Sequence, residues 1–189
     1  MATLISKPMS LQTYLSLETD TDHAYELVNG ELVEVPPESE ANRRIASFLF
    51  AYFLQQGIPS YRLTQKTEIV VSGAGATTRI PDLMILSEEL ATALEGATRS
   101  TIMPDMPPPL LVVEVVSPGQ ENRDYRYKRS EYAARGISEY WIVDPMLRRV
   151  TVLEWVEGLY EEQAYEGDSS IRSVLLGEMS LTPNQLWHA

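Results

Sequence analysis

Two strongly apolar segments in the middle of the chain predict buried β-strands, and each contains a single carboxylate. Ile80–Leu86 contains Asp82, and Leu110–Val116 contains Glu114. A near-continuous apolar run of this length is typical of a strand buried on both faces of a sheet. An ionised carboxylate inside such a strand is costly unless it is paired or binds a metal ion. The two acids are therefore the first candidates for a functional site.

The hydrophobic pattern before these strands predicts a helix, a hairpin and a second helix. Helical spacing of apolar residues over 9–17 indicates the first helix. Asn29-Gly30 lies between two β-prone runs within residues 25–35. This dipeptide is the strongest short hairpin signal, because both residues tolerate positive φ. Apolar residues then recur at helical spacing from 45 to 53, with Ser39 as a candidate N-cap and Gly57 just past the end.

The remaining segments alternate between strand and helix patterns. They are an extended run over 61–71, a short helix over 87–96, a helix over 123–135, a core strand over 139–144, a hairpin over 148–165, and a short strand with a turn over 173–186. No internal repeat and no low-complexity tract interrupts this order. The pattern therefore predicts one mixed α/β domain over residues 1–189.

Composition excludes several classes of site. The 189 residues contain no cysteine, which rules out disulfides, thiolate metal sites and thiol catalysis. His23 and His188 are the only histidines, so a multi-histidine zinc site or a serine–histidine triad is not expected. The first ten residues do not show a signal-peptide pattern, and no run approaches the roughly 20 apolar residues of a membrane span. We therefore expect a cytoplasmic protein with no membrane partner.

The net charge of −12 argues against a general nucleic-acid binder, because phosphate contacts need clustered lysine and arginine. The distribution of charge changes this picture, since residues 123–135 carry a local net charge of +3. A small basic face on an acidic body is one interpretation, and it would receive a phosphate backbone locally. Solvated helix charges are the other interpretation, and the sequence does not choose between them.

The chemistry of the two acids suits a divalent cation. If their strands are neighbours in one sheet, Asp82 and Glu114 approach each other and present carboxylate oxygens to a shared ion. Two carboxylates, a backbone carbonyl and waters suit Mg²⁺ or Mn²⁺. Such an ion polarises a phosphoryl oxygen and lowers the pKa of an attacking water. Lys128, on the next predicted helix, would position that water or stabilise charge on the phosphate.

The chain resembles a known protein family. The resemblance is to the Uma2 family of restriction-endonuclease-like proteins, formerly a domain of unknown function and abundant in cyanobacteria, within the PD-(D/E)xK nuclease superfamily. It covers roughly residues 10–165 and implies a restriction-endonuclease-like core: a central mixed sheet flanked by helices, with an added hairpin at each end. Its motifs are Tyr25-Glu26-Leu27-Val28-Asn29-Gly30-Glu31-Leu32-Val33-Glu34, Arg79-Ile80-Pro81-Asp82, Val113-Glu114-Val115-Val116-Ser117-Pro118, and Lys128 followed by Tyr140-Trp141-Ile142-Val143-Asp144-Pro145.

Carried over position by position, the resemblance implies that Asp82 and Glu114 bind the metal, with the Val115 backbone carbonyl as a further ligand. The superfamily places a lysine two residues after the second acid, but Val116 stands there in this chain. Related families move the lysine onto the following helix, where Lys128 is the matching candidate. Three more acids are weaker candidates for the cluster: Glu31 in the hairpin, Glu68 on the strand before Asp82, and Asp124 one helical turn before Lys128.

Each candidate also has a purely structural interpretation. Asp82 would cap a turn at the start of its strand, a common role for aspartate. Glu114 would form a buried pair with an arginine such as Arg79. Lys128 would pair with Asp124 at i, i+4, which contributes at most about 0.5 kcal/mol on an exposed helix.

The sequence therefore predicts a metal-dependent endodeoxyribonuclease with DNA as substrate, Mg²⁺ or Mn²⁺ as cofactor, and a homodimer as the assembly. Asp82, Glu114 and Lys128 are its expected catalytic residues. The competing interpretation is a non-catalytic scaffold or binding module that keeps the nuclease fold. The acidic net charge and the valine at position 116 favour this second interpretation, because fold alone does not establish chemistry.

Overall fold

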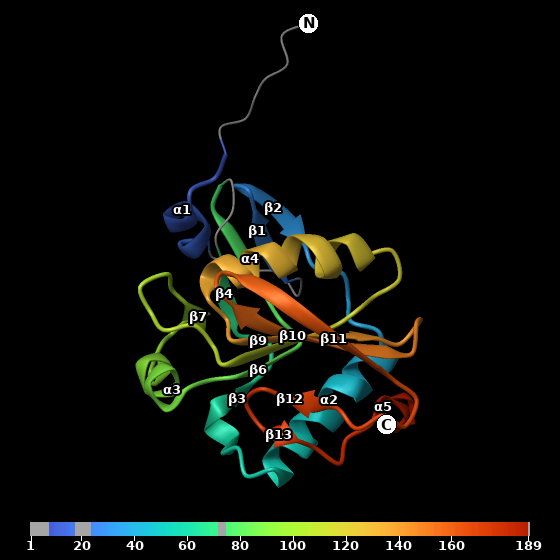
Figure 1. The fold of residues 1–189 in the computed structure, drawn as a ribbon. Helices are drawn as coiled ribbons and strands as arrows, with labels where there is room; N and C mark the ends of the chain where they lie inside the picture. Colours follow the sequence, from blue (N-terminus) through green and yellow to red (C-terminus); the bar gives the residue numbers. More distant parts are fainter. Residues whose placement is uncertain (1–7, 18–23, 72–74, 189) are drawn as a thin grey trace, which may run out of the picture.

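A six-stranded mixed sheet forms the centre of the computed structural model, which describes residues 8–17, 24–71 and 75–188. Its strand order is β11-β10-β9-β8-β6-β3, and β8 and β9 form its one parallel pair (Figure 1). The strands span Leu63–Thr64 (β3), Leu83–Ile85 (β6), Leu111–Val115 (β8), Glu139–Asp144 (β9), Arg149–Val156 (β10) and Leu159–Glu166 (β11). The predicted adjacency of the two acid-bearing segments is confirmed, because β6 pairs with β8.

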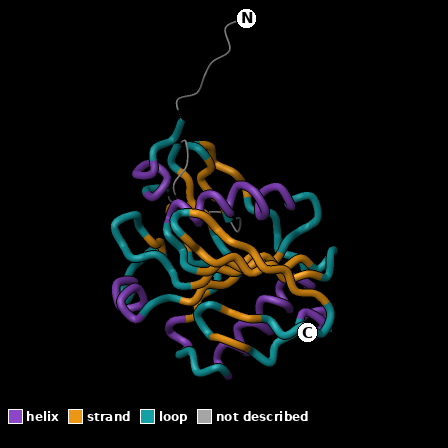
Figure 2. Tube along the Cα trace, viewed as in Figure 1, coloured by secondary structure: helices purple, strands orange, loops and turns teal. Residues whose placement is uncertain are grey.

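Helices cover both faces of this sheet, as Figures 1 and 2 show. On one face, α2 (Glu40–Gln55) and α5 (Pro183–Trp187) pack against Leu111, Val113 and Val115 of β8. On the other face, α4 (Arg129–Arg135) packs over alternate residues such as Val112. Successive side chains of a strand point to opposite faces. Burial on both faces therefore explains why β8 is apolar along nearly its whole length.

The predicted hairpin forms from β1 (Tyr25–Val28) and β2 (Glu31–Glu34). Asn29 and Gly30 have φ values of 52° and 83°, as a type I′ turn requires. The backbone N–H groups of Leu27 and Asn29 donate to the hydroxyls of Thr78 and Thr77, each at 3.0 Å. These contacts fasten the hairpin to β5 (Thr77–Arg79), which belongs to a separate three-stranded sheet with β4 (Glu68–Val71) and β7 (Thr101–Ile102).

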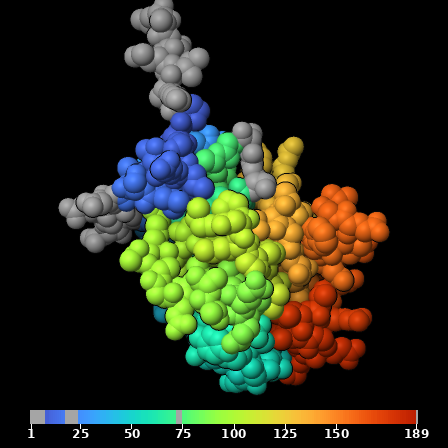
Figure 3. Space-filling model, turned by 90° about the vertical axis from the view of Figure 1, so that its left-hand side faces the viewer, coloured from blue at the N-terminus to red at the C-terminus, as the bar shows by residue number. Residues whose placement is uncertain are grey.

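The short helix α1 (Leu11–Leu15) packs against the segment between α3 (Glu88–Leu94) and β7. Arg99 lies over the Tyr14 ring at 4.6 Å and donates to backbone oxygens of this helix. Figure 3 shows the blue N-terminal segment on top of the yellow-green region that contains α3 and β7. Segments far apart in sequence therefore form one face here.

The long helix starts and ends close to the predicted residues. Ser39 is the N-cap of α2, and its hydroxyl accepts a hydrogen bond from the Asn42 N–H at 3.1 Å. The predicted helix over 123–135 also forms and ends at Gly136 with φ 76°. Its first part, Arg123–Lys128, is a π-helix (η2), which the hydrophobic pattern does not distinguish from an α-helix.

Three sequence predictions require correction. Only Leu83–Ile85 of the predicted strand Ile80–Leu86 is a strand (β6), because Ile80-Pro81-Asp82 forms the connection from β5, which belongs to another sheet. The extended run over 61–71 is likewise divided: a 3₁₀ turn (η1, Ser60–Arg62) leads into β3, and β4 follows separately. The tail forms the ribbon of β12 (Arg172–Ser173) and β13 (Gly177–Glu178) and then the unpredicted helix α5.

No helix in the described residues has the length and apolar character needed to cross a bilayer. His23 lies outside the described residues.

Candidate active site

The register of the central sheet brings Asp82 and Glu114 together. Leu83 pairs with Val113 and Met84 with Val112. Asp82 immediately precedes Leu83 and Glu114 immediately follows Val113, so the two acids lie next to the last pair of this register. Asp82 Oδ2 also accepts a hydrogen bond of 2.6 Å from the N–H of Val115. Asp82 therefore lies at the entrance to β6 and is held by the backbone of the strand that bears Glu114.

Lys128 reaches this acidic pair from the last residue of η2. Its Nζ lies 2.7 Å from Glu114 Oε2 and 2.9 Å from Asp124 Oδ1. All three side chains are buried, with exposed fractions of 4–6%. The Tyr132 hydroxyl donates to the other oxygen of Glu114, Oε1, at 2.5 Å. Lys128 does pair with Asp124, as the structural interpretation predicted, but the pair is buried and includes Glu114.

Burial controls the ionisation of this cluster. Loss of solvent raises the pKa of Asp82 to about 6, against the opposing effects of the Val115 N–H and the Lys128 charge. Burial also raises the pKa of Glu114, while Lys128 opposes that shift. Burial by itself would lower the pKa of Lys128, but Glu114 and Asp124 raise it above its usual value. A carboxylate pair with raised pKa values beside a charged lysine is characteristic of functional sites.

An open cleft of about 320 Å³ gives access to the cluster. Asn42, in the first turn of α2, forms part of its wall and donates through Nδ2 to the Val115 carbonyl at 3.1 Å and to Ser117 Oγ at 3.0 Å. Sequence reasoning missed Asn42, although a signal was present. It lies three residues before Ile45, so a polar residue occupies the apolar face of α2. The charged residues that line the cleft are Glu26, Glu38, Asp82, Glu114, Arg123, Asp124 and Lys128.

A family model described as "Putative restriction endonuclease", named Uma2, matches residues 11–184 of this chain. The chain belongs to the Uma2 family. Among solved structures, it is similar to "a putative nuclease belonging to DUF820" from Anabaena variabilis, with a TM-score of 0.74 and 17% sequence identity. That match covers 96% of this chain and 98% of the other, and it confirms the restriction-endonuclease-like fold. No curated protein matches the chain.

The weaker acidic candidates of this Uma2 chain have different positions. Asp124 lies in the cleft, as described above. Glu31 is exposed on β2, away from the residues that line the cleft. Glu68 is buried on β4, where Thr101 Oγ1 donates to its Oε2 at 2.8 Å and the Tyr14 hydroxyl donates to its Oε1. Neither Glu31 nor Glu68 lines the cleft.

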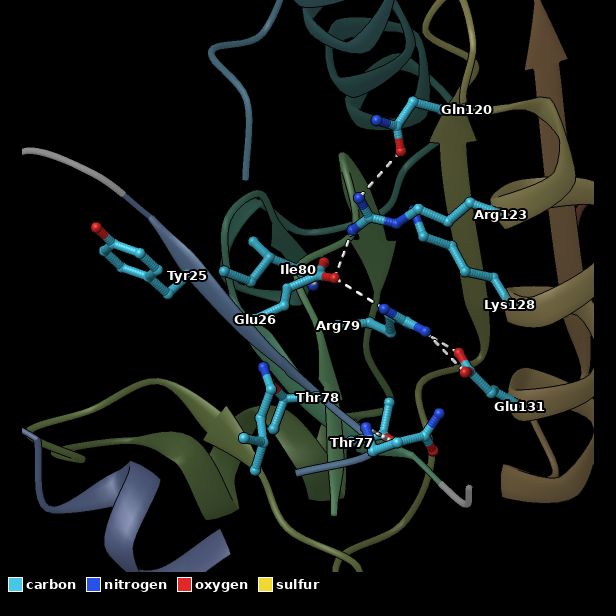
Figure 4. Close-up of polar contacts among 12 residues, drawn as sticks. Tyr25, Glu26, Thr77, Thr78, Arg79, Ile80, Gln120, Arg123, Lys128 and Glu131 are labelled. Atoms are coloured by element: carbon cyan, nitrogen blue, oxygen red, sulfur yellow. Dashed lines mark hydrogen bonds and ion pairs between the residues drawn. The ribbon is translucent and has the colours of Figure 1, made fainter. Parts of the chain in front are cut away.

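Glu26 is the hairpin acid that does reach the cleft, and the sequence analysis did not select it. Its side chain is 1% exposed and bonds to Arg79 and Arg123 (Figure 4). Arg79, proposed as a partner for Glu114, instead pairs with Glu26 and Glu131. A sequence signal for Glu26 existed, because the run Tyr25–Val28 places this acid between apolar residues of a strand.

The oxygen atoms of Asp82, Glu114 and the Val115 carbonyl have lone pairs that no hydrogen bond uses. Within the described part of the chain, Asp82 Oδ1 has no hydrogen-bond partner, whereas each Glu114 oxygen accepts one contact and the Val115 carbonyl accepts from Asn42. Each of these oxygens has a second lone pair. No group of three or more Asp, Glu, His or Cys side chains in the described residues is arranged around a metal position. The oxygens that could hold a cation here are those of two carboxylates and one carbonyl, and an octahedral Mg²⁺ ion would need waters to complete its shell.

Proposed function

We propose that this chain is a metal-dependent endonuclease that hydrolyses DNA phosphodiester bonds. The observation that carries the proposal is the gathering of Asp82, Glu114 and Lys128 in one open cleft, where Asp82 is bonded to the Val115 N–H and Lys128 to Glu114. Membership of Uma2 and the fold of the Anabaena protein support a nuclease over other uses of these residues. The acidic end of the sheet would receive the cation, and the cleft would admit the phosphodiester.

A bound divalent cation supplies Lewis acidity to a phosphoryl oxygen and lowers the pKa of a coordinated water. The chain itself supplies the ligands and their ionisation. Asp82, with a pKa of about 6, is ionised at neutral pH. Lys128 favours the ionised form of Glu114, because its charge opposes the effect of burial. An ammonium group has three N–H donors and two of them face carboxylates, so one remains for the attacking water or a phosphate oxygen.

The decisive experiment is nicking of supercoiled plasmid by the pure protein in Mg²⁺ or Mn²⁺, with EDTA as the blank. Asp82→Asn and Glu114→Gln are expected to reduce the rate at least about 100-fold, the order lost when a group that stabilises charge in the transition state is removed. Glu31→Gln is the matched control, because Glu31 is an exposed acid outside the cleft. Equal trace activity in the wild type, Asp82→Asn and Glu31→Gln would remove the enzymatic proposal.

A non-catalytic scaffold is the second candidate, and the charge of the cleft favours it. Five carboxylates and two cationic residues line the cleft, and Lys128 is already bonded to two of those acids. Calorimetric titration with Mn²⁺ separates the candidates. A nuclease should bind Mn²⁺ with an affinity that Asp82→Asn abolishes, whereas a scaffold without a metal site should show no such dependence.

The proposed enzyme acts in the cytoplasm and as a homodimer, so that two sites address the two strands of a duplex. Sedimentation equilibrium at micromolar concentration tests the assembly. A single species with the mass of one 21.3 kDa chain would exclude the dimer at that concentration.

A further inference from the structure

We infer that Arg123 is a phosphate-binding residue of the cleft and that Glu26, from the N-terminal hairpin, positions it. Arg123 is the first residue of η2, five residues before Lys128, and both line the cleft that contains Asp82 and Glu114. Figure 4 shows its guanidinium beside the Glu26 carboxylate and close to the Lys128 side chain. The inference rests on the proposed function and names the group that would contact the phosphodiester.

Glu26 holds this arginine from a fixed position. Its Oε1 accepts a hydrogen bond of 3.0 Å from the backbone N–H of Ile80, two residues before Asp82. Its Oε2 accepts from Arg79 Nη1 at 2.9 Å and from Arg123 Nη2. Arg79 is fixed in turn by two hydrogen bonds of 2.7 Å to Glu131 of α4. The Glu26 carboxylate therefore connects the segment that bears Asp82 to the helix that bears Lys128.

Arg123 has donors that the protein leaves unused. A guanidinium has five N–H groups. Nη2 donates to Glu26 and Nη1 donates to Gln120 Oε1 at 3.2 Å. Nε is buried and has no hydrogen-bond partner among the described residues. Each Nη carries two N–H groups, so the second N–H of Nη1 and of Nη2 also has no partner among the described residues.

The unused Nη donors of Arg123 fit a phosphate group. The Lys128 side chain is 6% exposed and bonded to two acids, whereas Arg123 is 21% exposed and bonded to one. A phosphodiester that approaches Asp82 and Glu114 meets an acidic surface, and Arg123 is the more exposed of the two cations that line the cleft. The planar fork of arginine matches two oxygens of one phosphate better than the single point charge of lysine does.

A purely structural role is the alternative, in which Arg123 only closes the hairpin onto η2. The two roles differ in how binding depends on salt, because each phosphate contact to B-DNA contributes about 0.9 to the slope of log K against log salt concentration. We would measure binding of a short DNA duplex in Ca²⁺ across a range of KCl concentrations. The variants are Arg123→Gln and Arg126→Gln. The second removes the same charge from an exposed position on the same helix, outside the cleft.

Arg123→Gln is expected to weaken duplex binding about tenfold, as for loss of one charged hydrogen bond, and to reduce the slope by about 0.9. The effect of Arg126→Gln on the slope should be smaller. Equal slopes for the wild type and Arg123→Gln would overturn the inference, even if the protein still cut plasmid. Arg123-dependent binding without cleavage would leave the inference standing and remove the nuclease proposal. Absence of duplex binding by the wild type at low salt would remove both.

Glu26→Gln tests the positioning role separately. Removal of a negative charge from the cleft should strengthen binding of a polyanion if only electrostatics matters. If Glu26 positions Arg123, binding should instead weaken, and the salt slope should fall toward that of Arg123→Gln. Glu31→Gln, an exposed acid on the same hairpin, is the charge-matched control. Tighter binding by Glu26→Gln, with circular dichroism showing a folded protein, would refute the positioning role.

Discussion

Replacement of Lys128 by methionine removes the ammonium group and keeps most of the length of the side chain. Two buried carboxylates, Glu114 and Asp124, then lose the cation that lies within 2.9 Å of each. Breaking a buried pair by removal of one partner costs about 3–5 kcal/mol, because an uncompensated charge remains in the interior. An exposed i, i+4 pair costs at most about 0.5 kcal/mol. The loss in the free energy of unfolding therefore distinguishes a buried Lys128 pair from an exposed one.

The penalty also depends on pH, with a definite sign. Burial raises the pKa of Glu114 above its unfolded value of about 4.3, so the folded state binds more protons in this range. Stability then falls as pH rises from that unfolded value toward the folded pKa. Lys128 opposes this shift, so its removal raises the folded pKa further and makes the fall steeper. The difference between wild type and Lys128→Met should be smaller near pH 5 than above pH 7.

Urea unfolding in EDTA, followed by circular dichroism at pH 5 and pH 8, measures the effect. Arg43→Met is the matched control. Its pair with Glu40 is exposed, with side-chain exposures of 57% and 68%, and solvent screens it, so its loss of stability should be much smaller than that of Lys128→Met at both pH values. A loss below 1 kcal/mol for Lys128→Met at pH 8 would contradict the buried arrangement of Lys128.

Three further outcomes are expected. The raised pKa of Asp82, about 6 against 3.8, means that this carboxyl lowers stability as pH rises from about 4 to 6, and urea midpoints in EDTA should show a smaller fall over this range for Asp82→Asn. Gly30→Ala forces a side chain into a backbone with φ +83° and places its Cβ 2.6 Å from the Pro8 Cβ. It should cost at least about 1 kcal/mol, and an unchanged melting temperature would argue against this turn. Phe53→Ala should cost about 3–5 kcal/mol by urea unfolding, because Phe53 is fully buried and its ring lies 5.8 Å from that of Trp141; a loss below 2 kcal/mol would contradict that packing.

Local signals predicted much of the fold. The dipeptide Asn29-Gly30, the cap at Ser39 and the glycine at position 136 each fix one backbone conformation, and each element they predict forms near its expected residues. The division of Ile80–Leu86 could not be predicted in the same way. Only Leu83–Ile85 pairs in the central sheet, whereas the preceding Thr77–Arg79 pairs with β4, and these partners are distant in sequence.

Prediction of the candidate site was limited in the same way, because part of it depends on contacts between segments distant in sequence. Asp82 and Glu114 were expected to approach each other if their strands were neighbours, and β6 does pair with β8, while their catalytic role stays a prediction. The contact between Glu26 and Arg123 joins residues 97 positions apart and depends on how the hairpin docks. The burial of Lys128 depends on the packing of η2 against the sheet. Neither feature is encoded in a local pattern.

The two outer strands of the central sheet affect how the molecule would meet a second copy of itself. An outer strand presents unpaired backbone groups, which template aggregation unless the edge is short or charged. At one edge, β3 contains only Leu63–Thr64. At the other edge, β11 presents the exposed acids Glu161, Glu162 and Glu166, which would repel the same strand of another molecule. Continuous sheet formation between copies is therefore disfavoured at both ends, and a dimer of this nuclease-like fold would have to form through other surfaces.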